Sequence, residues 1–113
     1  IQTDHLSFSH VRMMMNLVMM GIDCLPRGGV IHVRIRNEQV GLTITLTCKG
    51  NRARLRPDIA NGIKGIEPED GWRPETIQPL FSKIICDGLG GELTASESEE
   101  TVIIMAAGIR AEG

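Results

Sequence analysis

Apolar side chains recur at helical spacing in the first quarter of the chain. From His10 to Leu25 they form two neighbouring stripes, which predicts a helix that Ser7 or Ser9 can cap and that Pro26 and Gly28-Gly29 end. The broader stripe is expected to face the core, and the second to be further core or a contact surface for a partner. The first holds Val11, Met14, Met15, Val18, Ile22 and Leu25, and the second holds Met13, Leu17, Met20 and Cys24.

The next two segments alternate apolar and polar residues, as strands do when one face is buried and the other exposed. Val30–Arg36 and Val40–Cys48 are predicted to pair as a hairpin around the loop Asn37-Glu38-Gln39. The first strand is expected to bury Ile31, Val33 and Ile35, and the second to bury Val40, Leu42, Ile44, Leu46 and Cys48 and to expose Thr43, Thr45 and Thr47.

A short helix and a longer one are predicted in the middle of the chain. Pro57-Asp58 opens the short helix, which ends near Gly65, and Glu67–Arg73 is expected to be a loop because it contains proline, glycine and acids. The long helix is predicted from Thr76 to Gly88, since this start leaves Pro79 in the first turn, where its missing N–H is harmless. Its apolar stripe holds Ile77, Leu80, Phe81, Ile84 and Ile85.

A second hairpin is predicted to end the chain. Glu92–Ser96 and Thr101–Ala107 are its strands, and the acidic residues from Glu97 to Glu100 its solvated loop, while only Ile109 is expected to hold the tail. The element order predicts a two-layer α+β sandwich of residues 1–113, a single domain with both long helices on one face of a mostly antiparallel sheet.

The composition of the chain excludes several classes of protein. Hydrophobic residues make up 42% and charged residues 23% of the 113 residues, which excludes a disordered chain. A net charge of −2 and few aromatic residues give no reason to expect a nucleic-acid partner, and no apolar run is long enough for a membrane span. Three widely spaced cysteines without metal-ligand spacing predict reduced thiols, no metal site and a cytoplasmic location. The start at Ile1, without Met, suggests a piece of a longer protein.

Two runs resemble the ATPase domain of histidine kinases, in which a helix reading N-L-x-x-N-A is followed by a proline, two glycines and a strand. The runs are Asn16-Leu17-Val18-Met19-Met20-Gly21, followed by Pro26-Arg27-Gly28-Gly29-Val30, and Leu89-Gly90-Gly91-Glu92-Leu93. The resemblance covers nearly the whole chain in element order. It implies a degenerate histidine-kinase ATPase fold, of the type called GHKL or Bergerat.

The departures from this pattern lie at the nucleotide site. Asn16 matches the first family asparagine, but Met20 stands at the Mg²⁺-binding asparagine, and a thioether is a poor ligand for a hard cation. Cys48 stands at the adenine-reading aspartate, two residues before Gly50. The run from Thr76 to Leu80 replaces the glycine-rich phosphate loop. These losses imply that the chain binds no nucleotide, metal or other cofactor.

A kinase-like domain without an ATP site is similar to the C-terminal domain of the alphaproteobacterial histidine phosphotransferases (the ChpT-type family). The resemblance implies a phosphorelay role, in which phosphoryl groups pass between the receiver domains of a hybrid kinase and response regulators. In that family a helical hairpin carries the phosphorylated histidine and forms the homodimer, so this chain alone is expected to be a monomer without catalytic residues. The alternatives are a divergent but active ATP-binding domain and a purely structural interaction domain.

Two sets of residues are candidates for contact with receiver domains. Arg52, Arg54 and Arg56, together with Lys49, form either a solvated edge or a docking patch for the acidic rim of a receiver. Met13 and Met20 are core residues or a contact surface, since methionine suits surfaces that accept several partners. The three histidines lack the acid that follows the phosphorylated histidine in the family, so they are expected to be ordinary surface or boundary residues. They are His5, His10 and His32.

Overall fold

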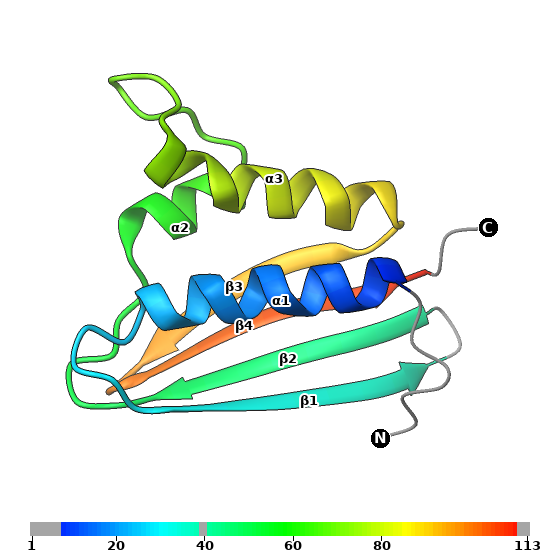
Figure 1. Cartoon of the computed structure of the whole chain (residues 1–113), viewed down its shortest axis with the longest axis horizontal. Helices are drawn as coiled ribbons and strands as arrows, with labels where there is room; N and C mark the ends of the chain where they lie inside the picture. Colours follow the sequence, from blue (N-terminus) through cyan, green and yellow to red (C-terminus); the bar gives the residue numbers. More distant parts are fainter. Residues whose placement is uncertain (1–7, 39–40, 111–113) are drawn as a thin grey trace.

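A computed structural model describes residues 8–38 and 41–110, in which three helices and four strands follow the predicted order (Figure 1). The helices are α1 (Phe8–Asp23), α2 (Pro57–Gly62) and α3 (Pro74–Gly88), and the strands are β1 (Val30–Glu38), β2 (Gly41–Lys49), β3 (Glu92–Ser98) and β4 (Thr101–Ile109). None of the helices in this part of the chain is long and apolar enough to cross a membrane.

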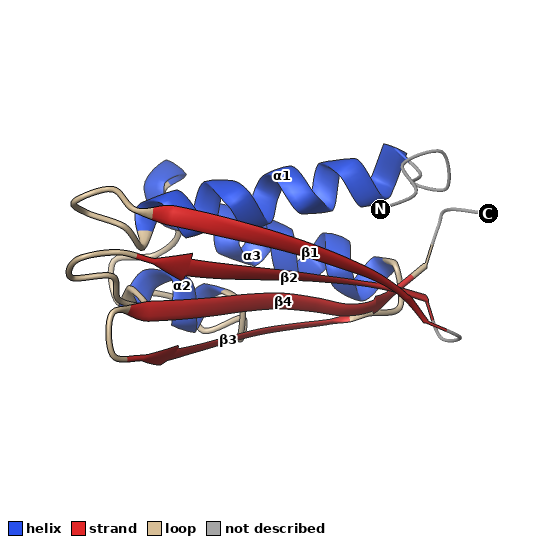
Figure 2. Ribbon diagram, turned by 90° about the horizontal axis from the view of Figure 1, so that it is seen from below, coloured by secondary structure: helices blue, strands red, loops and turns tan. Residues whose placement is uncertain are grey.

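The four strands form one antiparallel sheet in the order β1-β2-β4-β3. In Figure 2 the strands lie in front and the three helices behind, so the helices share one face of the sheet. The core lies between these two layers, where Leu46 of β2 is paired with Ile104 of β4 and both side chains are fully buried. The predicted two-layer α+β architecture is therefore confirmed.

The strands β1, β3 and β4 are each two residues longer than predicted, and one bulge changes a face assignment. Val40 and Gln39 lie outside the described residues. The pairing of β2 with β4 shifts between Leu42 and Ile44, because β4 carries an extra residue near Gly108, whose φ is +68°. The backbone N–H of Gly108 donates to the Thr43 hydroxyl at 3.3 Å, so Thr43 is buried and not exposed as predicted.

The second stripe of α1 is the one that is fully buried in the core, while the broader stripe is only partly so, with Leu25 buried and Met14 and Val18 packed against the core. Met15 of the broader stripe is 59% exposed and Ile22 is 57% exposed. The physical reason is Gly21, where an added Cβ would lie 2.9 Å from the Cys48 sulfur, so only a glycine lets this face of the helix approach β2 so closely. Ser9 lies inside the helix and is buried, so it is not the N-cap, and Ser7 lies outside the described residues. The buried side chains of the second stripe are Met13, Leu17, Met20 and Cys24.

The helix α3 begins at Pro74, two residues earlier than predicted, so Pro79 lies beyond its first turn. Pro79 packs on α2: a Cβ added to Gly62 would lie 2.6 Å from the Pro79 Cβ. Phe81 and Ile84 of the predicted apolar stripe are more than half exposed, so the prediction that they face the core is wrong. The core-facing positions of α3 are Pro79, Ser82 and Cys86.

Candidate functional site

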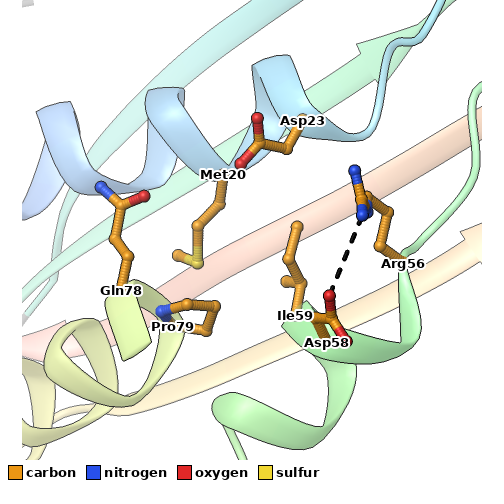
Figure 3. Close-up of a pocket in the computed structure, with 7 residues that line it drawn as sticks. All are labelled: Met20, Asp23, Arg56, Asp58, Ile59, Gln78 and Pro79. Carbon is orange, nitrogen blue, oxygen red and sulfur yellow. Dashed lines mark ion pairs between the residues drawn. The ribbon is translucent and has the colours of Figure 1, made fainter. Parts of the chain in front are cut away.

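A small cavity lies where the end of α1 meets the beginnings of α2 and α3. Its volume is about 180 Å³, below the roughly 300 to 1,000 Å³ of pockets that hold drug-sized ligands. Figure 3 shows its walls, with Met20 reaching from α1 towards Pro79 of α3. The lining residues are Met20, Asp23, Arg56, Asp58, Ile59, Gln78 and Pro79.

Apolar packing closes the floor of this cavity. Met20 is 1% exposed, and its side chain lies in the same core as Ile59 of α2. Because Gly62 lets α2 contact Pro79 of α3 directly, the two helices leave little space between them. The cavity therefore has a thioether and a pyrrolidine ring in its interior, neither of which binds a hard cation.

Charged groups occur only at the mouth of the cavity. A guanidinium nitrogen of Arg56 lies 3.8 Å from a carboxylate oxygen of Asp58, and both side chains are about half exposed. An exposed pair at this distance contributes little to stability, on the order of 0 to 1 kcal/mol. Asp23 supplies a second carboxylate from the last turn of α1.

The other residues of the degenerate nucleotide pattern do not line this cavity. Cys48 is fully buried under Gly21, where it packs as a core residue. Gly50 lies against the loop between α1 and β1, and an added Cβ would lie 2.4 Å from the carbonyl oxygen of Gly28. Asn16 lines a neighbouring groove between α1 and α3, which among the described residues shares only Gln78 with this cavity. The structure therefore does not bring Asn16, Met20, Cys48 and Gly50 together into one site.

The arginine-rich loop after β2 (residues 50–56) is held through its backbone, and its three arginine side chains are exposed. The backbone N–H of Leu55 donates to a carboxylate oxygen of Glu97 at 2.9 Å, and that of Arg52 to Glu100 at 3.3 Å. Arg52 has a φ of +65°, and Arg54 donates its backbone N–H to the carbonyl of Cys24 at 3.1 Å. The acidic turn is thus a support for this loop, a role that the sequence analysis missed.

The two candidate partner surfaces have different outcomes. Met13 is 0% exposed, so like Met20 it is a core residue, and the prediction that these methionines contact a partner is wrong for this fold. Arg52, Arg54 and Arg56 are exposed, as a docking patch requires.

The histidines occupy three different settings. His10 is buried in α1, so the expectation of a surface or boundary position is wrong for it. His32 lies on an exposed position of β1, as expected. His5 lies outside the described residues.

All three cysteines are buried free thiols. Burial removes the thiolate from water, which raises the pKa of Cys24 and raises that of Cys48 and Cys86 from the ordinary 9.0 to about 11. The carboxylates of Asp87 and Glu92 raise the pKa of Cys86 further. These thiols are therefore neutral and poorly nucleophilic near pH 7.

The raised thiol pKa values predict a loss of stability in alkali. Between pH 9 and 11 the unfolded chain loses the thiol protons of Cys48 and Cys86, which the folded chain keeps. The free energy of unfolding therefore falls as the pH rises, by about 1.4 kcal/mol per pH unit for each of these two thiols. Urea unfolding between pH 8 and 11 measures this slope. The double variant Cys48→Ala/Cys86→Ala should have a flatter slope, and an unchanged slope would contradict the assignment.

Comparisons with known proteins agree with one another. Protein phosphotransferase ChpT of Brucella abortus (strain 2308) is 23% identical over 96 residues, which cover 85% of this chain and 46% of that protein. A solved structure of a bacterial phosphotransferase matches with a TM-score of 0.79 and 22% identity, over 87% of this chain and 48% of the other. The chain thus spans about half the length of both proteins, and the structural match indicates a shared fold.

The match to a protein family covers most of the sequence. The family model of the histidine phosphotransferase C-terminal domain matches residues 1–101 of the 113. This range contains α1 to β3, including the cavity and the arginine-rich loop. The chain therefore belongs to the histidine phosphotransferase C-terminal domain family.

Proposed function

We propose that this chain is the docking domain of a phosphorelay histidine phosphotransferase, with a histidine-kinase-like fold that does not bind ATP. In the whole protein, phosphoryl groups pass between the receiver domains of a hybrid kinase and response regulators. The observation that carries the proposal is the buried Met20 side chain, which stands at the position of the Mg²⁺-binding asparagine and fills the space beside Pro79.

The remaining walls support the same conclusion. The cavity of about 180 Å³ is too small for a nucleotide, and its exposed carboxylates lie at the mouth and not around a metal position. Cys48 packs in the core, so no acceptor stands where an adenine amino group would be recognised. The residues that the structure describes therefore offer a nucleotide no metal ligand at Met20 and no adenine partner at Cys48.

The test is isothermal titration of the chain with ATP, with and without Mg²⁺. We expect no measurable heat of binding. A micromolar dissociation constant, about 8 kcal/mol of binding free energy, would instead establish the alternative of a divergent but active ATP-binding domain.

The phosphoryl-carrying histidine is proposed to lie in a helical hairpin outside this chain. His10 is buried, and His32 is followed by Val33 and not by an acid. Incubation with a phosphorylated receiver domain should therefore leave residues 1–113 unlabelled, while the full-length protein becomes labelled. Acid-labile label on His5, His10 or His32 would contradict this proposal.

Since the hairpin is proposed to form the homodimer, light scattering should report a monomer for residues 1–113 at micromolar concentration.

Arg54 is the arginine best placed to attract a receiver, because its backbone is fixed by Cys24 and its side chain is exposed. The rim of a receiver site is acidic, so Arg54→Ala should slow association about two- to fivefold and reduce its salt dependence, with unchanged melting. Stopped-flow binding of a receiver to the full-length protein measures this. The matched control is Arg34→Ala on β1, which removes the same charge from another surface and should have little effect.

A further inference from the structure

The outer face of α1 carries a regular row of large side chains that the core does not use. Phe8, Arg12, Met15, Met19 and Ile22 follow one another at alternating spacings of four and three residues. All five are exposed, and Phe8 reaches 78%. This is the spacing with which one helix receives another along its length, in a coiled coil or a helix-binding groove.

A groove between α1 and α3 adjoins this row. It has a volume of about 360 Å³, and its α3 wall is apolar except for Gln78. At its edge the Gln78 side-chain amide contacts the Met19 sulfur at 3.3 Å, which links the two helices. Six residues line the groove: Arg12, Asn16, Gln78, Phe81, Ile84 and Ile85.

The groove has one charge, and that charge is positive. The guanidinium carbon of Arg12 lies 6.0 Å from the centre of the Phe8 ring, and no carboxylate among the described residues pairs with it. The other polar lining groups are the neutral amides of Asn16 and Gln78. An apolar groove with a single free cation fits an amphipathic segment that brings one carboxylate.

We infer that this groove binds an amphipathic helix from the N-terminal half of the same phosphotransferase, with an acidic side chain set against Arg12. The inference rests on the proposed function, in which this chain is one part of a longer protein. The two matched proteins are about twice the length of the aligned region, and the family is described as a C-terminal domain, so a comparable length of polypeptide is available. A tethered helix has a high effective concentration, so a groove of this size can hold it in cis.

Thiol labelling of a single introduced cysteine tests the inference. The native thiols are buried and neutral near pH 7, so an Ile84→Cys side chain, at a position 55% exposed, reacts selectively with dithiobis(nitrobenzoate). We expect labelling in the full-length protein to be at least about tenfold slower than in residues 1–113 alone, which corresponds to 1.4 kcal/mol of docking free energy. The control is Ser96→Cys, an exposed position on β3, which should react equally fast in both.

A second substitution separates docking from a change in folding. Arg12→Glu in the full-length Ile84→Cys protein should restore much of the labelling rate without lowering the melting temperature, because this side chain is exposed. Equal labelling of Ile84→Cys in the two lengths overturns the inference. Protection of residues 1–113 alone that grows with concentration would assign the groove to a second copy, and protection that needs an added receiver would assign it to that partner.

The same preparations distinguish this failure from a failure of the proposed function. Phosphoryl transfer from a receiver to the full-length protein is measured in parallel. Transfer without protection at position 84 overturns only the groove assignment. Protection without transfer overturns the phosphorelay role and leaves the docked helix in place.

Discussion

Replacing Met20 by asparagine is expected to destabilise the fold by about 3 kcal/mol and to create no nucleotide site, although it supplies the side chain that the kinase pattern has there. Met20 is 1% exposed and packs in the core. The shorter amide leaves part of this space empty, and its donors and acceptor lose water without gaining partners. In a chain of this size the melting temperature should fall by about 10 °C or more.

The matched control is Met15→Asn on the same helix, at a position that is 59% exposed. Both variants replace methionine by asparagine in a helix, so both lose the same helix propensity, a few tenths of a kcal/mol. The difference between their free energies of unfolding in urea therefore measures the effect of burying the side chain at position 20. Met15→Asn should change stability by no more than about 0.5 kcal/mol. Equal effects would contradict the assignment of faces on α1, and micromolar ATP binding by Met20→Asn would mean that this methionine alone closes the site.

The sheet could be predicted from the sequence because its signal is local and repeated. In β2 the alternation of apolar residues with threonines has a period of two, and the hairpin with β1 needs only a short connection. The exception, Thr43, is buried because a bulge near Gly108 in a strand 65 residues away turns a backbone N–H towards it. This contact depends on the register between β2 and β4, and the local alternation of apolar and polar residues carries no information about that register.

The face of α1 could not be predicted because two stripes of similar apolarity compete. Counting apolar side chains favours the stripe with Met15 and Ile22, but close approach to the sheet is decided by the smallest residue. Gly21 lies beside Met20 and Cys24, where the Cys48 sulfur leaves no room for a Cβ. The small volume of one residue at the contact therefore decides which face of α1 packs on the sheet, and the total hydrophobicity of each stripe does not.

The candidate site was predictable in its chemistry but not in its geometry. The sequence indicates that Met20 and Cys48 replace polar family residues, and this needs no coordinates. It contains no signal that Gln78 and Pro79 would close on Met20, or that Glu97 would hold the backbone of Leu55, since the latter contact joins residues 42 positions apart. The exposed groove between α1 and α3 is lined by Phe81 and Ile84, which periodicity predicted to be buried.

Substitutions in the loop between α1 and β1 are expected to destabilise the fold as much as substitutions in the core. The reason is that the backbone of this loop lies against the backbone at the end of β2. Gly29 has a φ of +147°, and an added Cβ would lie 2.2 Å from the carbonyl oxygen of Lys49 and 3.0 Å from the Cα of Gly50. Neither neighbour is a flexible side chain, so the end of β2 or the start of β1 must shift. Gly29→Ala is therefore expected to lower the free energy of unfolding by about 3 kcal/mol or more.

Gly28 supplies the matched control for this prediction, since it also has a positive φ, of +76°, but no atom lies within 4 Å of its added Cβ. Gly28→Ala should lower the free energy of unfolding only by the backbone strain that alanine has in the left-handed region, about 1 to 2 kcal/mol. The difference between the two variants in urea unfolding measures the collision at Gly29 together with the difference in strain between φ values of +147° and +76°. Because this backbone contact anchors the arginine-rich loop through Gly50, the Gly29 variant should also expose the backbone N–H groups of residues 52–55 to faster hydrogen exchange. Equal stability of the two variants would mean that the loops separate freely, and the close packing of Gly29 against Lys49 would then contribute nothing to the fold.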